Sequence, residues 1–160
     1  MLSSNLDKQG FGYLDAAARS RYRLPLRFTP AVGTVLVGAA LAFQSPVGLG
    51  VMALVALSGA LFPRHMVLDV AWNVVLRHLW HGPTLPATPA PRRFSYALSA
   101  VLLADAALSF ANGAPVLGSA LAGGVVLGGA VLTASLWCLG SWIYRLLRAL
   151  AHRATLLGAR

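Results

Sequence analysis

Four long apolar stretches are the feature that most constrains how this chain can fold. They cover residues 28–45, 47–62, 94–111 and 116–143. A helix needs about 20 residues to cross the roughly 30 Å hydrocarbon core of a membrane, and about 17 is a lower limit. The first and third stretches just reach this limit, the second falls slightly short, and the fourth exceeds it. Because backbone groups in lipid must hydrogen-bond to one another, each stretch is predicted to be a helix.

The composition favours lipid over water as the main solvent. Hydrophobic residues make up 58% of the 160 residues and charged residues only 11%, whereas soluble domains carry about 25% charged residues. The formal charge of +9 comes from three basic clusters between the apolar stretches, an arrangement that suits anionic lipid headgroups better than nucleic acid. We therefore expect lipid partners and no nucleic-acid partner.

The positions of the charges predict the orientation in the membrane. The turns at 44–46 and 111–115 contain no charged residue, and all thirteen Lys and Arg residues lie outside the apolar parts of the four stretches. By the positive-inside rule, both termini and the central segment face the cytoplasm. We therefore expect a multi-pass membrane protein.

The two halves of the chain resemble each other. RFTPAVGTVLVGAALAFQSPVGLG, from Arg27, is similar to RFSYALSAVLLADAALSFANGAPVLG, from Arg93. A repeat with two crossings returns to its starting side, so the two copies are parallel. The predicted fold is therefore all-α, an integral membrane four-helix bundle built as two parallel-repeat helical hairpins joined by an amphipathic interfacial helix.

The joining helix is predicted from residues 64–80, where apolar residues recur at helical spacing. The opposite side carries polar residues, namely His65, Asp69, Asn73, Arg77 and His81. Such a helix is expected on the inner membrane surface, with its polar side facing solvent or headgroups. Upstream, a short helix capped by Asp15 is expected to end at Pro25.

These elements divide the chain into five parts. They are a cytoplasmic N-terminal tail with a short interfacial helix (1–27), the first transmembrane hairpin (28–62), the cytoplasmic amphipathic helix with a proline-rich linker (63–93), the second transmembrane hairpin (94–144) and a basic cytoplasmic tail (145–160).

Aromatic and basic residues near the predicted helix ends are candidates for the lipid interface. They are Arg19, Arg21, Arg23, Trp72, Trp80, Arg92, Arg93, Trp137, Trp142, Tyr144, Arg145 and Arg148. Bound lipid is expected, and no cofactor is predicted.

Small residues recur every fourth position on two of the stretches, which lets helix backbones approach closely. They are Thr34, Gly38 and Ala42 on the first stretch and Ala120, Gly124 and Gly128 on the fourth. We expect packing within the four-helix unit, with a dimer face as the alternative.

Asp105 is the one acid well inside an apolar stretch, about 10 Å from the outer end at about 1.5 Å per residue. Carboxylates within a membrane are costly and often functional. Asp105 is expected either to hydrogen-bond as a neutral acid to Ser109, Thr133 or Ser135, or to contact a proton pathway or a partner.

Cys138 is the only cysteine, so no intramolecular disulfide is possible. It is predicted to lie at the cytoplasmic end of the fourth stretch, as a small packing residue. No nucleophile–base pair or phosphate loop is present, and His65 with Asp69 offers too few ligands for zinc. No catalytic or metal residue is therefore predicted, and a non-enzymatic role is expected.

A resemblance to a known family rests on LRFTPAVGTVLVGAALAF, PAPRRFSYALSAVLL, GAPVLGSALAGGVVLGGAVL and WCLGSWIYRLLR. In this order, over about residues 26–148, they resemble the small bacterial membrane proteins grouped as domain of unknown function 4395. The resemblance implies four helices, a location in the bacterial inner (cytoplasmic) membrane, and an association with thioredoxin-like and sulfurtransferase proteins. The family's last helix usually carries Cys-Leu-Gly-Cys, whereas this chain has Cys138, Leu139, Gly140 and Ser141.

Three functions are compatible with these features. We expect an accessory or scaffold subunit that packs against larger membrane-protein subunits. The resemblance and Cys138 support a second hypothesis, a membrane component of a thiol or sulfur redox system with a thioredoxin-like partner. A small proton-coupled transporter, based on Asp105 and the repeat, is the third.

Overall fold

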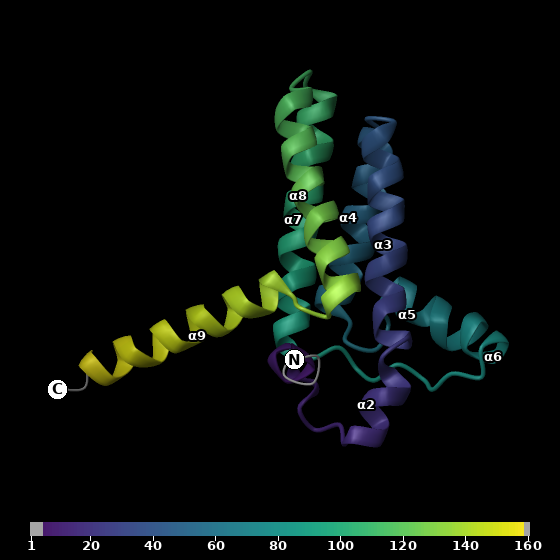
Figure 1. The fold of residues 1–160 in the computed structure, drawn as a ribbon. Helices are drawn as coiled ribbons and strands as arrows, with labels where there is room; N and C mark the ends of the chain where they lie inside the picture. The colour runs from purple at the N-terminus through teal and green to yellow at the C-terminus, as the bar shows by residue number, and fades with distance from the viewer. Residues whose placement is uncertain (1–4, 159–160) are drawn as a thin grey trace.

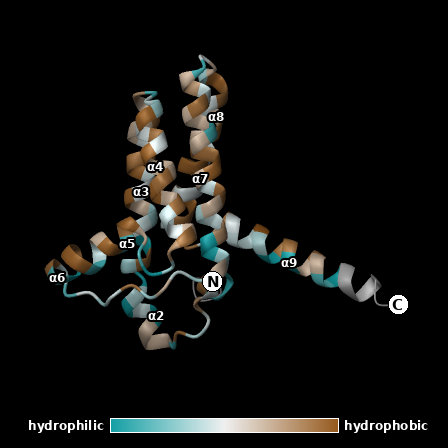
Figure 2. Cartoon of the chain, turned by 180° about the vertical axis from the view of Figure 1, so that it is seen from behind, coloured by the Kyte–Doolittle hydropathy of each residue, from teal (hydrophilic) through white to brown (hydrophobic). Residues whose placement is uncertain are grey.

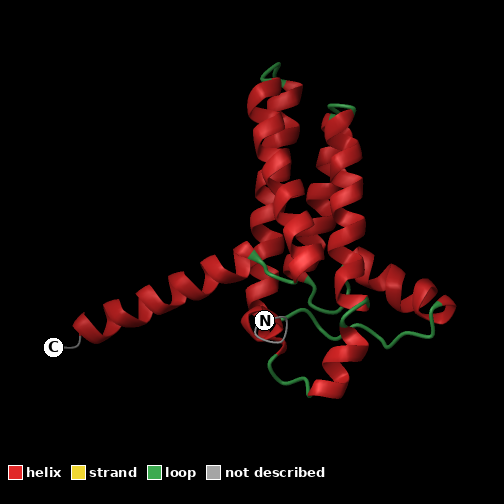
Figure 3. Cartoon of the chain, viewed as in Figure 1, coloured by secondary structure: helices red, strands yellow, loops and turns green. Residues whose placement is uncertain are grey.

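The computed structural model describes residues 5–158, with side chains through residue 153. Every regular element within these residues is a helix and none is a strand (Figure 3), which confirms the all-α prediction. In chain order the elements are η1 (Asp7–Phe11), α2 (Ala16–Tyr22), α3 (Pro25–Ala42), α4 (Pro46–Leu61), α5 (Val67–Ala71), η2 (Trp72–Leu76), α6 (Arg77–Leu79), α7 (Ala90–Ala111), α8 (Pro115–Ser135) and α9 (Leu139–Gly158). The short elements η1 and η2 are π-helical turns.

The four apolar helices α3, α4, α7 and α8 stand side by side (Figure 1). The turns α3–α4 and α7–α8 lie at one end, and α2, α5, α6 and the start of α9 lie at the other. Figure 2 shows hydrophobic residues along the four upright helices and more hydrophilic residues at the end with α2. The two uncharged turns are thus far from the basic segments, as the charge pattern predicts.

Length and composition allow three of the helical segments described here to cross a membrane. They are Ala16–Ala42, which joins α2 and α3, Ala90–Ala111 and Pro115–Ser135. Helix α4 is equally apolar but has 16 residues, or about 24 Å at about 1.5 Å per residue. This shortfall matches the expectation for the second apolar stretch.

The most extensive helix contacts join α4 to α7 and α3 to α8. Packing therefore runs between the two halves of the sequence more than within the first half, where α3 and α4 share fewer contacts than α7 and α8 do. The core between these helices is made by buried residues from all four of them. They are Val37, Leu49, Met52, Ala53, Leu103, Ala106 and Ala122.

The fourth apolar stretch is not one helix, as its hydropathy suggests, but two. Helix α8 ends at Ser135, and Leu136 adopts a left-handed conformation with φ of 53°. The chain then turns, and α9 leaves the other helices at a wide angle (Figure 1). The backbone N–H of Trp142 donates to the carbonyl of Cys138 at 3.1 Å, so Cys138 lies at the beginning of α9.

The end of α8 is held by the N-terminal part of the chain. A helix leaves its last four carbonyls without partners, and here three side chains donate to carbonyls near this end. The pairs are Asn5 Nδ2 to Ser135 O (3.1 Å), Gln9 Nε2 to Leu136 O (2.5 Å) and Arg27 Nη2 to Ala134 O (2.8 Å). These tertiary contacts explain why the helix ends inside an apolar stretch.

Elements α5, η2 and α6 form a continuous helical segment over residues 67–79, close to the predicted surface helix. Its polar side, however, partly faces the protein and not the solvent. Asp69 is buried, and Asn73 Oδ1 accepts a hydrogen bond from the backbone N–H of Leu85 at 2.7 Å. The exposed large apolar residues of this segment are Val67, Val74, Val75 and Leu79.

The N-terminal helix α2 is capped as predicted, because the Asp15 carboxylate accepts from the backbone N–H of Ala18 at 2.6 Å. Pro25 does not end the helical region but begins α3. Proline is tolerated there because the first turn of a helix needs no backbone N–H donor. The first apolar helix therefore starts three residues before Phe28.

Candidate functional site

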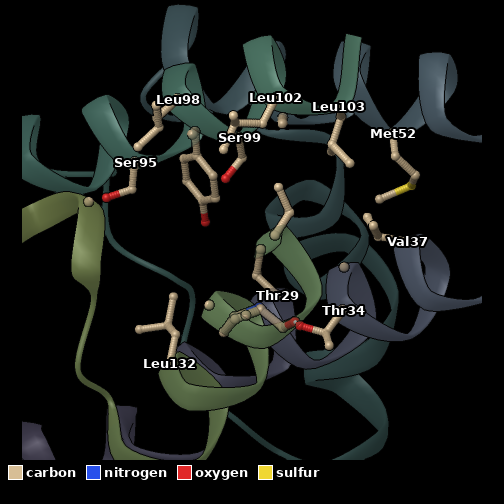
Figure 4. A pocket seen from close by; sticks show the side chains of 18 of the residues that line it. Thr29, Thr34, Val37, Met52, Ser95, Leu98, Ser99, Leu102, Leu103 and Leu132 are labelled. Carbon is tan, nitrogen blue, oxygen red and sulfur yellow. The ribbon is translucent and has the colours of Figure 1, made fainter. Parts of the chain in front are cut away.

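A cavity of about 180 Å³ lies between α3, α4, α7, α8 and the beginning of α9. Figure 4 shows apolar side chains on one part of its wall, among them Val37, Met52 and Leu103, from the middles of their helices. Thr29 and Ser95, from the beginnings of α3 and α7, line it nearer the basic end. The cavity thus runs from an apolar interior toward the polar end of the helices.

Glycines on α8 leave room for this cavity. Gly124, Gly128 and Gly129 all line it. A Cβ built at Gly124 or Gly128 meets no atom within 4 Å, whereas one at Gly129 lies 2.2 Å from Thr34 Oγ1. Only Gly129 of these three is therefore required for close helix packing, in its case against α3.

Arg92, in the first turn of α7, lies at the polar end of the cavity with only 5% of its surface exposed. Its guanidinium carbon lies 5.8 Å from the ring centroids of both Phe11 and Tyr96. Its Nη2 donates to the carbonyl of Leu26 at 3.4 Å. The Tyr96 hydroxyl interacts with the Arg92 guanidinium, but among the residues described neither Arg92 Nε nor this buried hydroxyl has a hydrogen bond of ordinary geometry.

A buried carboxylate lies at the same end of the molecule. Asp69 accepts hydrogen bonds from the hydroxyls of Thr29 and Thr88, the latter at 3.5 Å. An ion pair joins Arg19 Nη2 to Asp7 Oδ1 at 2.8 Å, whereas no ion pair closer than 4 Å joins Asp69 to Arg92. The hydroxyls thus satisfy Asp69 and leave the Arg92 guanidinium without a directly bound counter-ion.

Cys138 lines the cavity and is 8% exposed. Its sulfur lies 3.0 Å from Ser95 Oγ, which is itself 3.4 Å from Ser141 Oγ. The backbone of α9 comes very close here, because a Cβ at Gly140 would lie 2.9 Å from Ser95 Cα. A thiol and two hydroxyls therefore meet where α7 and α9 cross.

Asp105 lies elsewhere, exposed on the outer face of α7, and is not among the residues that line the cavity. The three hydroxyls expected to bind it donate instead to carbonyls four residues earlier in their own helices. These bonds are Ser109 to Asp105 O, Thr133 to Gly129 O and Ser135 to Val131 O, at 2.7, 2.8 and 2.7 Å. The expected side-chain partners of the carboxylate are thus engaged with their own helices.

Two residues expected at the lipid interface are buried within the protein instead. Trp72 is 2% exposed, with ring contacts to Phe28 and Trp80 and a hydrogen bond from Nε1 to Pro83 O at 3.1 Å. Arg92 is buried as described above. Neither side chain is therefore exposed to lipid headgroups.

The other candidate interface residues all lie at the end of the molecule opposite the turns. Arg19 pairs with Asp7 and donates to the carbonyl of Leu14, and Arg93 donates to Ala60 O at 2.8 Å. Half-buried aromatic residues are Trp137 and Tyr144. The exposed residues are Arg21, Arg23, Trp80, Trp142, Arg145 and Arg148.

The small-residue positions are mostly open. Thr34 contacts Gly129, which is internal packing of the expected kind. Gly38 and Gly128 are half-buried, and a Cβ at either meets no atom within 4 Å. The exposed positions are Ala42, Ala120 and Gly124.

Arg92 and Cys138 were singled out from the sequence, but the other two polar residues beside them in the cavity wall, Ser95 and Tyr96, were not. A signal for them exists, because these residues follow Arg92 by three and four positions and so share its face of α7. Ser99, seven positions after Arg92, continues the row and also lines the cavity. Among the residues described, no three His, Cys, Asp or Glu side chains come close enough to hold a metal ion.

The chain matches no curated protein and no solved structure to which it was compared. The sequence profile of one family, described as Domain of unknown function (DUF4395), matches residues 24–149. This range includes the four apolar helices, the cavity and the start of α9. The chain therefore belongs to the DUF4395 family, as its motifs suggest.

Proposed function

We propose that this protein is a non-enzymatic accessory or scaffold subunit of a larger assembly in the bacterial inner membrane. In this proposal α3, α4, α7 and α8 all cross the membrane, as two parallel-repeat hairpins. The uncharged turns face outward, and the basic end with both termini faces the cytoplasm.

The observation that supports a partner is the exposed carboxylate of Asp105 on an apolar helix face. A lone Asp near the centre of a membrane helix costs about 3 kcal/mol on insertion scales. No side chain described here hydrogen-bonds to this carboxylate, and its neighbours on the exposed face, Val101 and Leu108, are apolar. A partner helix that presents a basic or hydrogen-bond-donating side chain at this depth would remove the cost.

Lipid binding belongs to the same proposal. Helix α9 leaves the other helices at the basic end (Figure 1) and exposes both Leu146 and Leu150 and both Arg145 and Arg148. A helix of this kind lies in the membrane interface, where basic residues attract anionic headgroups.

Purification in a mild detergent tests the role of Asp105 in assembly. The wild-type protein should migrate with a partner subunit, and Asp105→Leu should lose that partner while staying folded. Val35→Leu changes an exposed apolar residue on α3 and serves as the matched control, which should keep the partner. If Asp105→Leu retains the same partner in the same yield, the proposal fails.

A thiol-redox role is the second candidate, supported by one observation. Cys138 directly precedes the first residue of α9, and its thiol lines the cavity 3.0 Å from Ser95 Oγ. Its test is the capture of a mixed disulfide with a thioredoxin-like protein through Cys138. Asp105 is not in the cavity wall, so nothing favours the proton-coupled transporter, and we do not propose it.

A further inference from the structure

We propose that the cavity binds a single-chain amphiphile with a carboxylate head, a fatty-acid-like molecule, with its head at Arg92 and Tyr96. Its chain would lie between α3, α4, α7 and α8. This inference rests on the cavity and does not depend on the scaffold role, which rests on Asp105.

Two buried polar groups mark the position of the head. Arg92 Nε and the Tyr96 hydroxyl belong to cavity-lining residues one helical turn apart on α7. The two side chains interact with each other, but among the described residues neither group has a hydrogen bond of ordinary geometry. Buried donors are normally satisfied, because an unmade hydrogen bond costs the desolvation of the group. A guanidinium has donors only, so the missing group is a hydrogen-bond acceptor.

The local charges favour an anionic acceptor. Arg92 is a permanent cation, and it sits in the first turn of α7, at the positive end of the helix dipole. The beginning of α9, at Cys138 and Gly140, lies against Ser95 on the same side of the cavity. The buried carboxylate of Asp69 opposes this field in part, but it accepts from two threonine hydroxyls and has no ion pair with Arg92 within 4 Å.

The rest of the wall suits one apolar chain. Away from Arg92 the cavity is lined by side chains such as Val37, Met52 and Leu103. Apolar protein cavities of about 150 Å³ accept a benzene ring, and this one measures about 180 Å³. It therefore has room for one short chain inside and not for a two-chain lipid.

The test uses the full-length protein in phosphatidylcholine nanodiscs and measures equilibrium binding of radiolabelled octanoate, with empty nanodiscs as background. Competition by 1-octanol and by octyltrimethylammonium compares a neutral and a cationic head on the same chain. We expect octanoate to bind about 10- to 100-fold more tightly than 1-octanol, the usual strength of a hydrogen bond to a charged group. We expect no competition by octyltrimethylammonium.

Variants locate the site. Gly128→Leu places a side chain in the cavity and should abolish binding, whereas Gly123→Leu adds the same side chain to the same helix outside the cavity and should not. Tyr96→Phe removes one donor and should weaken binding about 3- to 10-fold. Arg92→Gln should remove the preference for octanoate over 1-octanol. If Arg92→Gln fails to fold, the other variants still decide the question.

Three results would each overturn the proposal. The first is no octanoate binding above the background of empty nanodiscs, which would indicate that water occupies the polar end. The second is equal binding of octanoate and 1-octanol by the wild-type protein. The third is equal binding by the Gly128→Leu and Gly123→Leu variants.

Discussion

Replacement of Gly140 by alanine probes the contact that fixes the start of α9. A Cβ at this position would lie 2.5 Å from Ser95 Oγ, 2.8 Å from Ser95 Cβ and 2.9 Å from Ser95 Cα. The hydroxyl can rotate away, but the Cα belongs to the backbone of α7 and cannot move without displacing that helix. Gly140→Ala should therefore force α9 away from α7.

The size of the effect follows from two opposing terms. Overpacking of a close contact costs about 1–3 kcal/mol, while Gly→Ala inside a helix gains up to about 1 kcal/mol. Gly124→Ala on α8 is the matched control, because its new Cβ meets no atom within 4 Å. The difference between the two variants removes much of the helix-propensity term and leaves about 1–3 kcal/mol from the steric contact.

The free energy of unfolding of both variants can be measured by SDS titration of the purified protein in mixed micelles, followed by circular dichroism. We expect Gly124→Ala to match or exceed the wild-type stability and Gly140→Ala to fall below Gly124→Ala by about 1–3 kcal/mol. Equal stabilities of the two variants, within about 0.5 kcal/mol, would refute the close packing of α9 on α7.

Other contacts give further predictions. Gln9→Leu removes the side-chain donor to Leu136 O and should lower the free energy of unfolding by about 1–3 kcal/mol, the cost of leaving a buried acceptor unpaired; an unchanged SDS midpoint would contradict this. Cys138→Ser keeps a small polar side chain near Ser95 and should retain assembly, as judged by co-purification; loss of the partner with retained folding would support the redox role instead. Asp105→Asn keeps the size of the side chain and removes its charge, so it should weaken assembly if the partner contributes a cation, whereas normal assembly would indicate a hydrogen-bond donor.

The elements that the sequence predicted well are those that depend on local composition. Apolar stretches of helix length and uncharged turns identify α3, α7 and α8, because lipid leaves the backbone no alternative to a helix. The Asp15 cap is equally local, since the side chain contacts an N–H three residues later. The shortness of α4 is also visible in the sequence, because Pro46 and Pro63 bound its apolar stretch.

The break at the end of α8 could not be predicted in this way. The apolar stretch continues through Leu136 and Trp137 without glycine or proline, so hydropathy indicates one long helix. The helix ends because Asn5, Gln9 and Arg27 donate to its last carbonyls from more than 100 positions away in the sequence. Contacts at such separations leave no trace in local periodicity.

The surface helix shows a related limit. Periodicity separates its two faces but does not say which face meets the protein. Asp69 is buried because Thr29 and Thr88 offer hydroxyls to it.

The burial of Arg92, in α7, was not predicted for a similar reason. Arg92 is buried because the rings of Phe11 and Tyr96 flank it. A single charged residue near a predicted helix end is thus compatible with either a headgroup or an internal partner.

The orientation of the helices in the membrane is the central claim of this account, and impermeant thiol labelling of intact cells tests it directly. Ser45→Cys and Asn112→Cys place thiols at the two uncharged turns, and Thr84→Cys places one in the exposed central segment. The wild-type protein is the control, because its one thiol, at Cys138, is buried. We predict labelling at Ser45→Cys and Asn112→Cys in intact cells, and at Thr84→Cys only after permeabilisation. Protection of both turns, with labelling of Thr84→Cys in intact cells, would contradict the account.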